Sequence, residues 1–108
     1  MHMRYFGDSY DIVKLSLISC LRHFGDWSVH PMLTESASDS VVREFERFLG
    51  ARVISTEVLT TRTNRESYFA SAIQCGNLFL DPDTGLKMRT RNGLTAPKYL
   101  FASELSHL

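Results

Sequence analysis

The fold is indicated by one stretch of the sequence, N-L-F-L-D-P-D-T-G, at residues 77–85. Three apolar residues, 78–80, run without alternation into two acids, a proline and a glycine. A continuous apolar run is typical of a strand that is buried on both faces of a parallel sheet. We therefore predict a central parallel strand here, which places Asp81 and Asp83 just past its carboxyl end, where α/β sheets bind ligands.

Helix-like and strand-like patterns alternate along the rest of the chain. Helical spacing of apolar residues predicts helices over residues 8–24, 39–49 and 65–74, and from residue 96 onward. Strands are predicted at residues 27–30, 52–59 and 78–80, with a strand or loop at 86–93. This order favours one domain with a small Rossmann-like α/β fold, in which helices flank a mostly parallel sheet of three or four strands. The first two strands are expected to lie on either side of the third.

Two of the predicted helices carry different apolar patterns. In the helix at residues 39–49, apolar residues at i, i+1, i+4, i+7 and i+8 predict a narrow buried stripe made of Val41, Val42, Phe45, Phe48 and Leu49. The helix at residues 8–24 starts at a cap, Asp8 or Ser9, and is apolar over most of its surface. So wide an apolar face predicts a helix that is pressed into the core. The last helix is expected to bury Leu100, Phe101 and Leu105.

Composition narrows the classes of function. The 108 residues carry equal numbers of acidic and basic side chains, so no whole-protein attraction to nucleic acid or membrane is expected. No apolar stretch approaches the roughly 20 residues of a membrane helix, and no signal peptide is visible, so we predict a cytosolic protein without a membrane partner. Cys20 and Cys75 are expected to be unpaired, buried thiols.

The segment Asp81-x-Asp83-Thr84-Gly85 is the first candidate site. Two carboxylates at a strand end can hold Mg²⁺, or can divide the roles of nucleophile and acid in phosphoryl transfer. The alternative is a turn, in which Pro82 and Asp83 occupy the central positions and Asp81 caps backbone amides. We favour the turn, and therefore expect neither a metal ion nor a cofactor.

The second candidate site comprises Gly7, Asp8, Asp11 and Lys14. Gly7 allows a close turn, and the helix that follows offers free N–H groups to an anion, toward which Lys14 could reach. The alternative is a capped helix start that binds no ligand and on which the aromatic residues 5–6 pack.

Two further groups are candidates for binding. Lys87, Arg89, Arg91 and Lys98 fall close together and could contact the phosphates of a nucleic acid. His30 follows a predicted strand and precedes a proline, so it either lines a cleft or is simply half-buried. The four histidines show no metal-ligand spacing.

Three segments together carry a resemblance to known proteins. Y-F-G-D-S-Y-D-I-V-K at residues 5–14 and L-F-L-D-P-D-T-G at residues 78–85 resemble an uncharacterised family of bacterial proteins that carry both. W-S-V-H-P-M-L-T-E at residues 27–35 fits the same family. The layout is also distantly similar to ribosomal RNA adenine methyltransferases of the J type, and this similarity implies a Rossmann-like fold.

The match to those methyltransferases is partial. Their opening motif is matched by Gly7, Asp8, Asp11 and Lys14, and Asp81-Pro82 matches the start of their later motif. Asp83 stands where a second proline would be, and residues 32–35 contain no glycine where a cofactor loop needs backbone room. The resemblance therefore implies the fold without implying methyl transfer.

These observations predict a non-catalytic module that binds a macromolecule. A small sheet leaves edges and an apolar face incompletely covered, which favours a protein partner or a homo-oligomer. An inhibitor or regulator that binds a protein complex, such as one encoded by a mobile element, would suit this size. One alternative is a Mg²⁺-dependent nuclease or phosphotransferase that uses Asp8, Asp81 and Asp83, with Lys14 beside them. Another is a nucleic-acid accessory protein.

Overall fold

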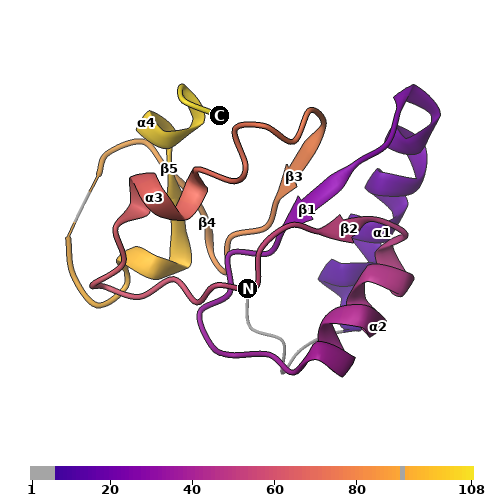
Figure 1. Cartoon of the computed structure of the whole chain (residues 1–108), viewed down its shortest axis with the longest axis horizontal. Helices are drawn as coiled ribbons and strands as arrows, with labels where there is room; N and C mark the ends of the chain where they lie inside the picture. Colours follow the sequence, from indigo (N-terminus) through magenta and orange to yellow (C-terminus); the bar gives the residue numbers. More distant parts are fainter. Residues whose placement is uncertain (1–6, 91) are drawn as a thin grey trace.

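Three short parallel strands form the centre of the molecule (Figure 1). The computed structural model describes residues 7–90 and 92–108. Within them, β1 (Ser28–His30) lies between β2 (Arg52–Val53) and β3 (Leu78–Leu80). The predicted small α/β fold with a mostly parallel sheet is therefore confirmed.

The order of the strands differs from the prediction. β1 is the central strand, whereas β3 is half-buried at one edge of the sheet, so the predicted central position of residues 78–80 is wrong. A run of apolar residues indicates that a strand is covered by other elements. It does not determine which strands lie beside it, because strand order depends on the path of the connecting segments. β2 is also shorter than predicted. Beyond it, the Leu59 N–H donates to the Leu33 carbonyl at 2.7 Å, in a loop outside the strand ladder.

Two helices, α1 (Ser9–Leu21) and α2 (Asp39–Leu49), pack together on one face of this sheet (Figure 1). The apolar cluster between them and the sheet contains fully buried residues from each element: Ile18, Val29, Phe45 and Leu49. Burial of large apolar side chains is the main favourable contribution to folding, so this cluster is the principal core on that side.

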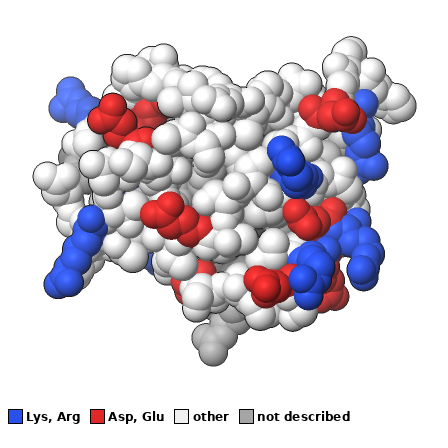
Figure 2. Space-filling view, viewed as in Figure 1, with Lys and Arg blue, Asp and Glu red and all other residues white. Residues whose placement is uncertain are grey.

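The second helix, α2, follows its predicted pattern. Ser38 caps its N-terminus by accepting a hydrogen bond from the Val41 N–H at 3.4 Å, and Gly50 ends it with a φ of 63°, a conformation that favours glycine. The cap is the residue just before position 39, where the predicted helix begins. The predicted stripe is buried or half-buried throughout. Charged side chains gather at the lower right of Figure 2, where α2 lies in Figure 1, so its polar face is in solvent.

The first helix, α1, departs from its predicted burial. Asp8 caps it as predicted, and a 3₁₀ turn, η2 (Arg22–Phe24), extends it. Within the helix, only Asp11 and Ile18 are buried. The sheet and α2 cover one side of α1 and leave most of its other apolar residues exposed, so the prediction that the whole helix is pressed into the core is wrong.

The two cysteines are both free thiols, as predicted. Cys20 lies on the uncovered side of α1 and is exposed, so its predicted burial is wrong, and Cys75 is half-buried. Periodicity places Cys20 among apolar neighbours, but it does not determine whether a second layer covers them.

The opposite face of the sheet packs against α3 (Arg65–Phe69) and a separate two-stranded parallel sheet, formed by β4 (Gly85–Lys87) and β5 (Tyr99–Phe101). Leu80 of β3 contacts a second buried cluster, which consists of Met32, Leu59, Tyr68, Phe69 and Leu100. The three-stranded sheet is thus covered on both faces by different elements.

The C-terminal part of the chain differs most from the prediction. The helix predicted over residues 65–74 ends at Phe69 and continues as turns. The helix predicted from residue 96 is a 3₁₀ turn, η3 (Ala96–Lys98), followed by β5 and a short helix, α4 (Ala102–Leu105). The expected burial of Leu100 and Phe101 is confirmed, but in a strand, while Leu105 is exposed. Pairing with β4 overrides the local helical pattern, as tertiary context often does.

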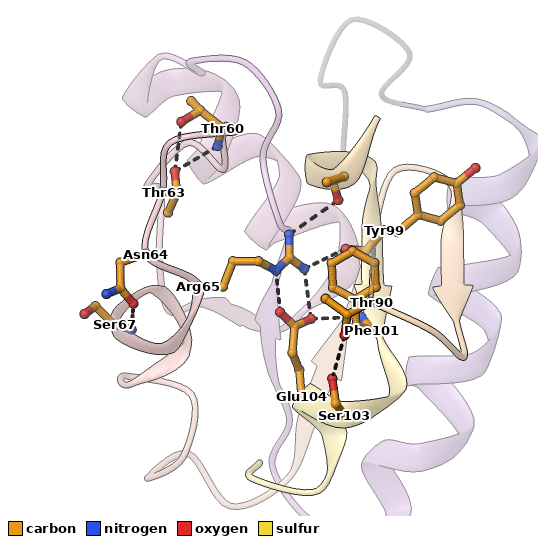
Figure 3. Close-up of polar contacts among 11 residues, drawn as sticks. Thr60, Thr63, Asn64, Arg65, Ser67, Thr90, Tyr99, Phe101, Ser103 and Glu104 are labelled. Atoms are coloured by element: carbon orange, nitrogen blue, oxygen red, sulfur yellow. Dashed lines mark hydrogen bonds and ion pairs between the residues drawn. The ribbon is translucent and has the colours of Figure 1, made fainter. Parts of the chain in front are cut away.

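Arg65 joins α3 to the second sheet through polar contacts (Figure 3). Its guanidinium forms a two-point ion pair with Glu104, and its Nη2–H also donates to the Tyr99 carbonyl at 2.7 Å. The guanidinium carbon lies 4.6 Å from the centre of the Phe101 ring. Because a two-point pair fixes orientation as well as distance, these contacts determine how β5 and α4 sit against α3.

Candidate functional site

The carboxyl ends of β1 and β3 border the place where the strand order reverses. From β1 the chain proceeds to β2 on one side, and then returns to β3 on the other side. Open α/β sheets bind ligands in the crevice at such a point. His30 ends β1 and Asp81 follows β3, and the Asp81 N–H donates to the His30 carbonyl at 3.0 Å. Residues from two candidate groups therefore lie side by side.

A buried ion-pair cluster occupies this edge. The Lys14 ammonium lies 3.0 Å from Asp11 Oδ1 and 2.9 Å from Asp81 Oδ2. Both carboxylates are almost completely buried, and the lysine side chain is about one-fifth exposed. Breaking such a pair leaves an uncompensated buried charge, so this cluster fastens the start of α1 to the end of β3.

The local sequence around Gly7 positions this cluster. Asp8 Oδ1 accepts hydrogen bonds from the N–H groups of Tyr10 and Asp11, at 2.9 and 3.1 Å. The Gly7 N–H, in a turn with a φ of 92°, donates to Asp11 Oδ2 at 2.7 Å. The Gly7 N–H and the Lys14 ammonium were candidates for binding an external anion. Carboxylates of the chain itself bind both of them.

Burial and charge act in opposite directions on the ionisation of this cluster. Burial raises the pKa of Asp81, and the Lys14 ammonium opposes that rise without cancelling it. For Lys14, burial alone would lower the pKa, but the carboxylates of Asp81 and Asp11 outweigh it and raise the pKa above 10.5. Lys14 is therefore firmly protonated at neutral pH, and its charge only partly compensates for the burial of the Asp81 carboxylate.

His30 is completely buried beside the cluster. Its Nδ1 accepts a weak hydrogen bond from the Met32 N–H at 3.4 Å, and its ring centre lies 4.9 Å from that of Tyr68. Its Nε2 is buried with no hydrogen-bond partner in the described part of the chain. Burial lowers the pKa of His30, and backbone groups of Tyr68 and of His30 itself partly oppose this. The imidazole is therefore a neutral member of the core and does not line an open cleft.

The acids after β3 have separate partners. Asp83 lies 3.8 Å from the Lys98 ammonium, and the Thr84 N–H donates to the Lys98 carbonyl at 2.8 Å. Asp8 is a helix cap and Asp81 pairs with Lys14, so the three acids of the alternative Mg²⁺ site have three different roles. Within residues 7–90 and 92–108, no group of three or more His, Cys, Asp or Glu side chains is arranged to hold a metal ion.

The described basic residues near the C-terminus have different surroundings. The Lys87 ammonium lies 3.7 Å from the centre of the Tyr99 ring, where a cation is attracted by the ring face. Lys98 is paired with Asp83, Arg89 is exposed, and Arg91 lies outside the described residues. Two of the four cations thus have partners within the chain.

A pocket lies between α3 and α4. It has a volume of about 460 Å³ and is lined by Arg65, Glu66, Phe69, Ile73, Ser103, Glu104, His107 and Leu108. Its strongest polar group, Arg65, is already engaged by Glu104 and by backbone carbonyls. No candidate residue from the sequence lines this pocket.

Among the described residues, exposed apolar side chains are most numerous on α1 and the turn that extends it, a surface that the sequence analysis did not predict. Five residues spaced by three and four positions share this side of the helix, which we call the outer face of α1: Tyr10, Val13, Leu17, Cys20 and Phe24. Tyr10 is 75% exposed and Phe24 83% exposed, with Val13 at 65% and Leu17 at 47%. The available signal was the absence of a charged side on this helix, which indicates that two surfaces need cover.

Comparisons with protein-family models, with curated proteins and with solved structures give no match to this chain. Among the described residues, no helix is long and apolar enough to cross a membrane.

Proposed function

We propose that this chain is a non-catalytic module that acts by binding a protein through the outer face of α1. The observation that carries this proposal is the exposure of two aromatic and two aliphatic side chains on one side of one helix. Contiguous apolar patches beyond a few hundred Å² mark interaction sites more often than ordinary surface. An inhibitor or regulator of a protein complex, working in the cytosol, is the class of protein that fits.

The ion-pair cluster supports binding over catalysis. Asp11, Lys14 and Asp81 satisfy one another at hydrogen-bond distance, and their side chains are mostly withdrawn from solvent. A general acid or base must instead reach the proton that it moves on a substrate. The cluster fixes the position of α1 on the sheet, and the outer face of α1 remains exposed.

A photo-crosslinking experiment tests this function directly. A benzophenone side chain placed at position 13 or 17 should give covalent protein adducts in cells, because both positions lie on the outer face. The matched control is position 44, which is exposed on the charged side of α2. Equal labelling from positions 13, 17 and 44, or no adduct from any of them, would contradict the proposal.

The enzymatic alternative predicts a metal-dependent activity, which the binding proposal does not. Mg²⁺-dependent cleavage of a nucleic acid or phosphoester by the purified chain, abolished by Asp81→Asn, would overturn the binding proposal. The Asp81→Asn variant should in fact retain all adducts formed at position 13, provided that circular dichroism shows it to be folded.

A further inference from the structure

We infer that the outer face of α1 packs against the same face of a second copy of this chain, in an antiparallel two-helix interface. This inference rests on the proposed function and names its partner. The alternating spacing of three and four residues from Tyr10 to Phe24 is the spacing that forms a seam between two packed helices. A seam of this kind is self-complementary, as a twofold-symmetric interface requires.

The area of the outer face fits a dimer. At the exposures of its two aromatic and two aliphatic residues, together with the exposed Cys20, it offers on the order of 600 Å² per copy. Two copies would bury about 1,200 Å² in total, which is the lower end of the range for specific protein interfaces.

The chemistry of the rim permits two copies to meet. Ser9 and Ser16 lie along one side of the outer face and are exposed but uncharged. On the other side, the charge of Lys14 is already balanced by Asp11 and Asp81. No uncompensated like charges of the described helix are therefore brought together along the seam, and such juxtapositions are what normally prevent self-association.

The ends of α1 favour the antiparallel direction. Antiparallel pairing sets the N-terminal end of each helix dipole near the C-terminal end of the other, whereas parallel pairing brings like ends together. The charged side chains at the two ends of α1 have contacts within their own copy: Asp8 caps the helix, and the Arg22 Nη2–H donates to the Leu49 carbonyl at 2.8 Å.

Antiparallel pairing also specifies which residues meet. With the twofold axis at Leu17, that residue faces Leu17 of the second copy. Tyr10 then faces Phe24, and Val13 lies within one residue, about 1.5 Å along the helix axis, of the level of Cys20. Large side chains are matched with large ones, and small with small, so the two helices can approach evenly along the seam.

Sedimentation velocity tests the pairing with a matched pair of variants. The wild-type chain should sediment at twice the chain mass at about 50 μM, because interfaces of this size give micromolar affinities. Leu17→Glu should shift it to the monomer, since each glutamate would face the other across the twofold axis. Ser19→Glu adds the same charge to the exposed side of the same helix, away from the seam, and should leave the dimer intact. Circular dichroism establishes that both variants are folded.

Disulfide trapping tests the direction. In a Cys75→Ser background, Val13→Cys should form a disulfide with Cys20 of the second copy on mild oxidation. A link within one chain is excluded because positions 13 and 20 lie about 10 Å apart along the helix. Peptide mapping that finds Cys20 joined to Cys20 instead would overturn the antiparallel arrangement.

The outcomes separate this inference from the proposed function. A wild-type monomer, or a dimer that Leu17→Glu leaves unchanged, overturns the inference. If such a monomer still gives adducts from position 13 at masses that do not correspond to two copies, the proposed function stands with another protein as the partner. Adducts at twice the chain mass support both.

Discussion

The two helices on the same face of the sheet are held there by different means. α2 is anchored by apolar side chains, with Phe45 and Leu49 completely buried and its charges in solvent. α1 buries one large apolar residue, Ile18, and is fastened by the ion pairs of Lys14. An amphipathic helix buries its whole apolar stripe within its own domain. A helix that is apolar over most of its surface and covered on one side presents its remaining apolar surface for association.

The largest difference should appear when one apolar residue of each helix is truncated. Phe45→Ala should lower the free energy of unfolding by about 3–5 kcal/mol, because it removes a fully buried ring and leaves a cavity. Leu17→Ala should change it by less than about 0.5 kcal/mol in a dilute, monomeric sample, because that side chain is half exposed. Urea denaturation measures both. A loss below about 1 kcal/mol for Phe45→Ala would show that α2 is not the apolar anchor.

The second effect concerns the ionic anchor of α1. Lys14→Met should cost about 2–3 kcal/mol, because it leaves the buried carboxylates of Asp11 and Asp81 without a counter-charge, although the partial exposure of Lys14 moderates the loss. Lys98→Met is the control, since its pair with Asp83 is longer and half exposed and should be worth less than about 0.5 kcal/mol. Equal losses for the two variants would remove the distinction between the anchors.

The sequence predicts α2 well because its apolar residues form one stripe with one possible direction of burial. For α1 the same reasoning fails, because apolar residues over most of a helix do not indicate which of its sides packs against the sheet. The position of β3 at the edge, and β5 in place of a helix, depend on pairing between segments distant in sequence. Such pairing is decided by tertiary contacts that a local pattern does not contain.

The candidate site was predictable in its parts but not in its assembly. Asp81 at a strand end, Asp8 at a helix start and Lys14 one turn further on could each be named from local spacing. Of these, Lys14 and Asp81 meet, because the start of α1 lies beside the carboxyl end of β3. Arg65 and Glu104, 39 positions apart, gave no local signal at all.

A smaller effect should distinguish the two N-caps. Asp8→Ala should destabilise the protein by about 1 kcal/mol, because its carboxylate accepts two hydrogen bonds at the start of α1. Ser38→Ala should cost nearer 0.5 kcal/mol, about the lower limit for a cap, because its one bond to α2 is 3.4 Å long. Thermal unfolding of the two variants side by side checks the order, which would be reversed if the cap of α2 were the stronger one.

The smallest effect is a pH dependence that belongs to the α1 anchor. Burial raises the pKa of Asp81, so its protonated form is favoured in the folded state, and stability falls as the pH rises through that pKa. In Lys14→Met the opposing charge is lost, and the unfolding free energy should decline with rising pH above the ordinary pKa of an aspartate more steeply than in the wild type. Adding Asp81→Asn should remove this extra slope. A slope that persists in the double variant would assign it to another group.

The ion pair between Lys14 and Asp81 also influences the time course of folding. It closes a loop between residues 67 positions apart, so chain entropy opposes it until the intervening β1–α2–β2 unit has formed. We therefore expect α1 to pack against the sheet late in folding, after the sheet has formed. Contacts made after the rate-limiting step govern the speed of unfolding more than the speed of folding. The lifetime of the native state is then set by the rate at which α1 separates from the sheet.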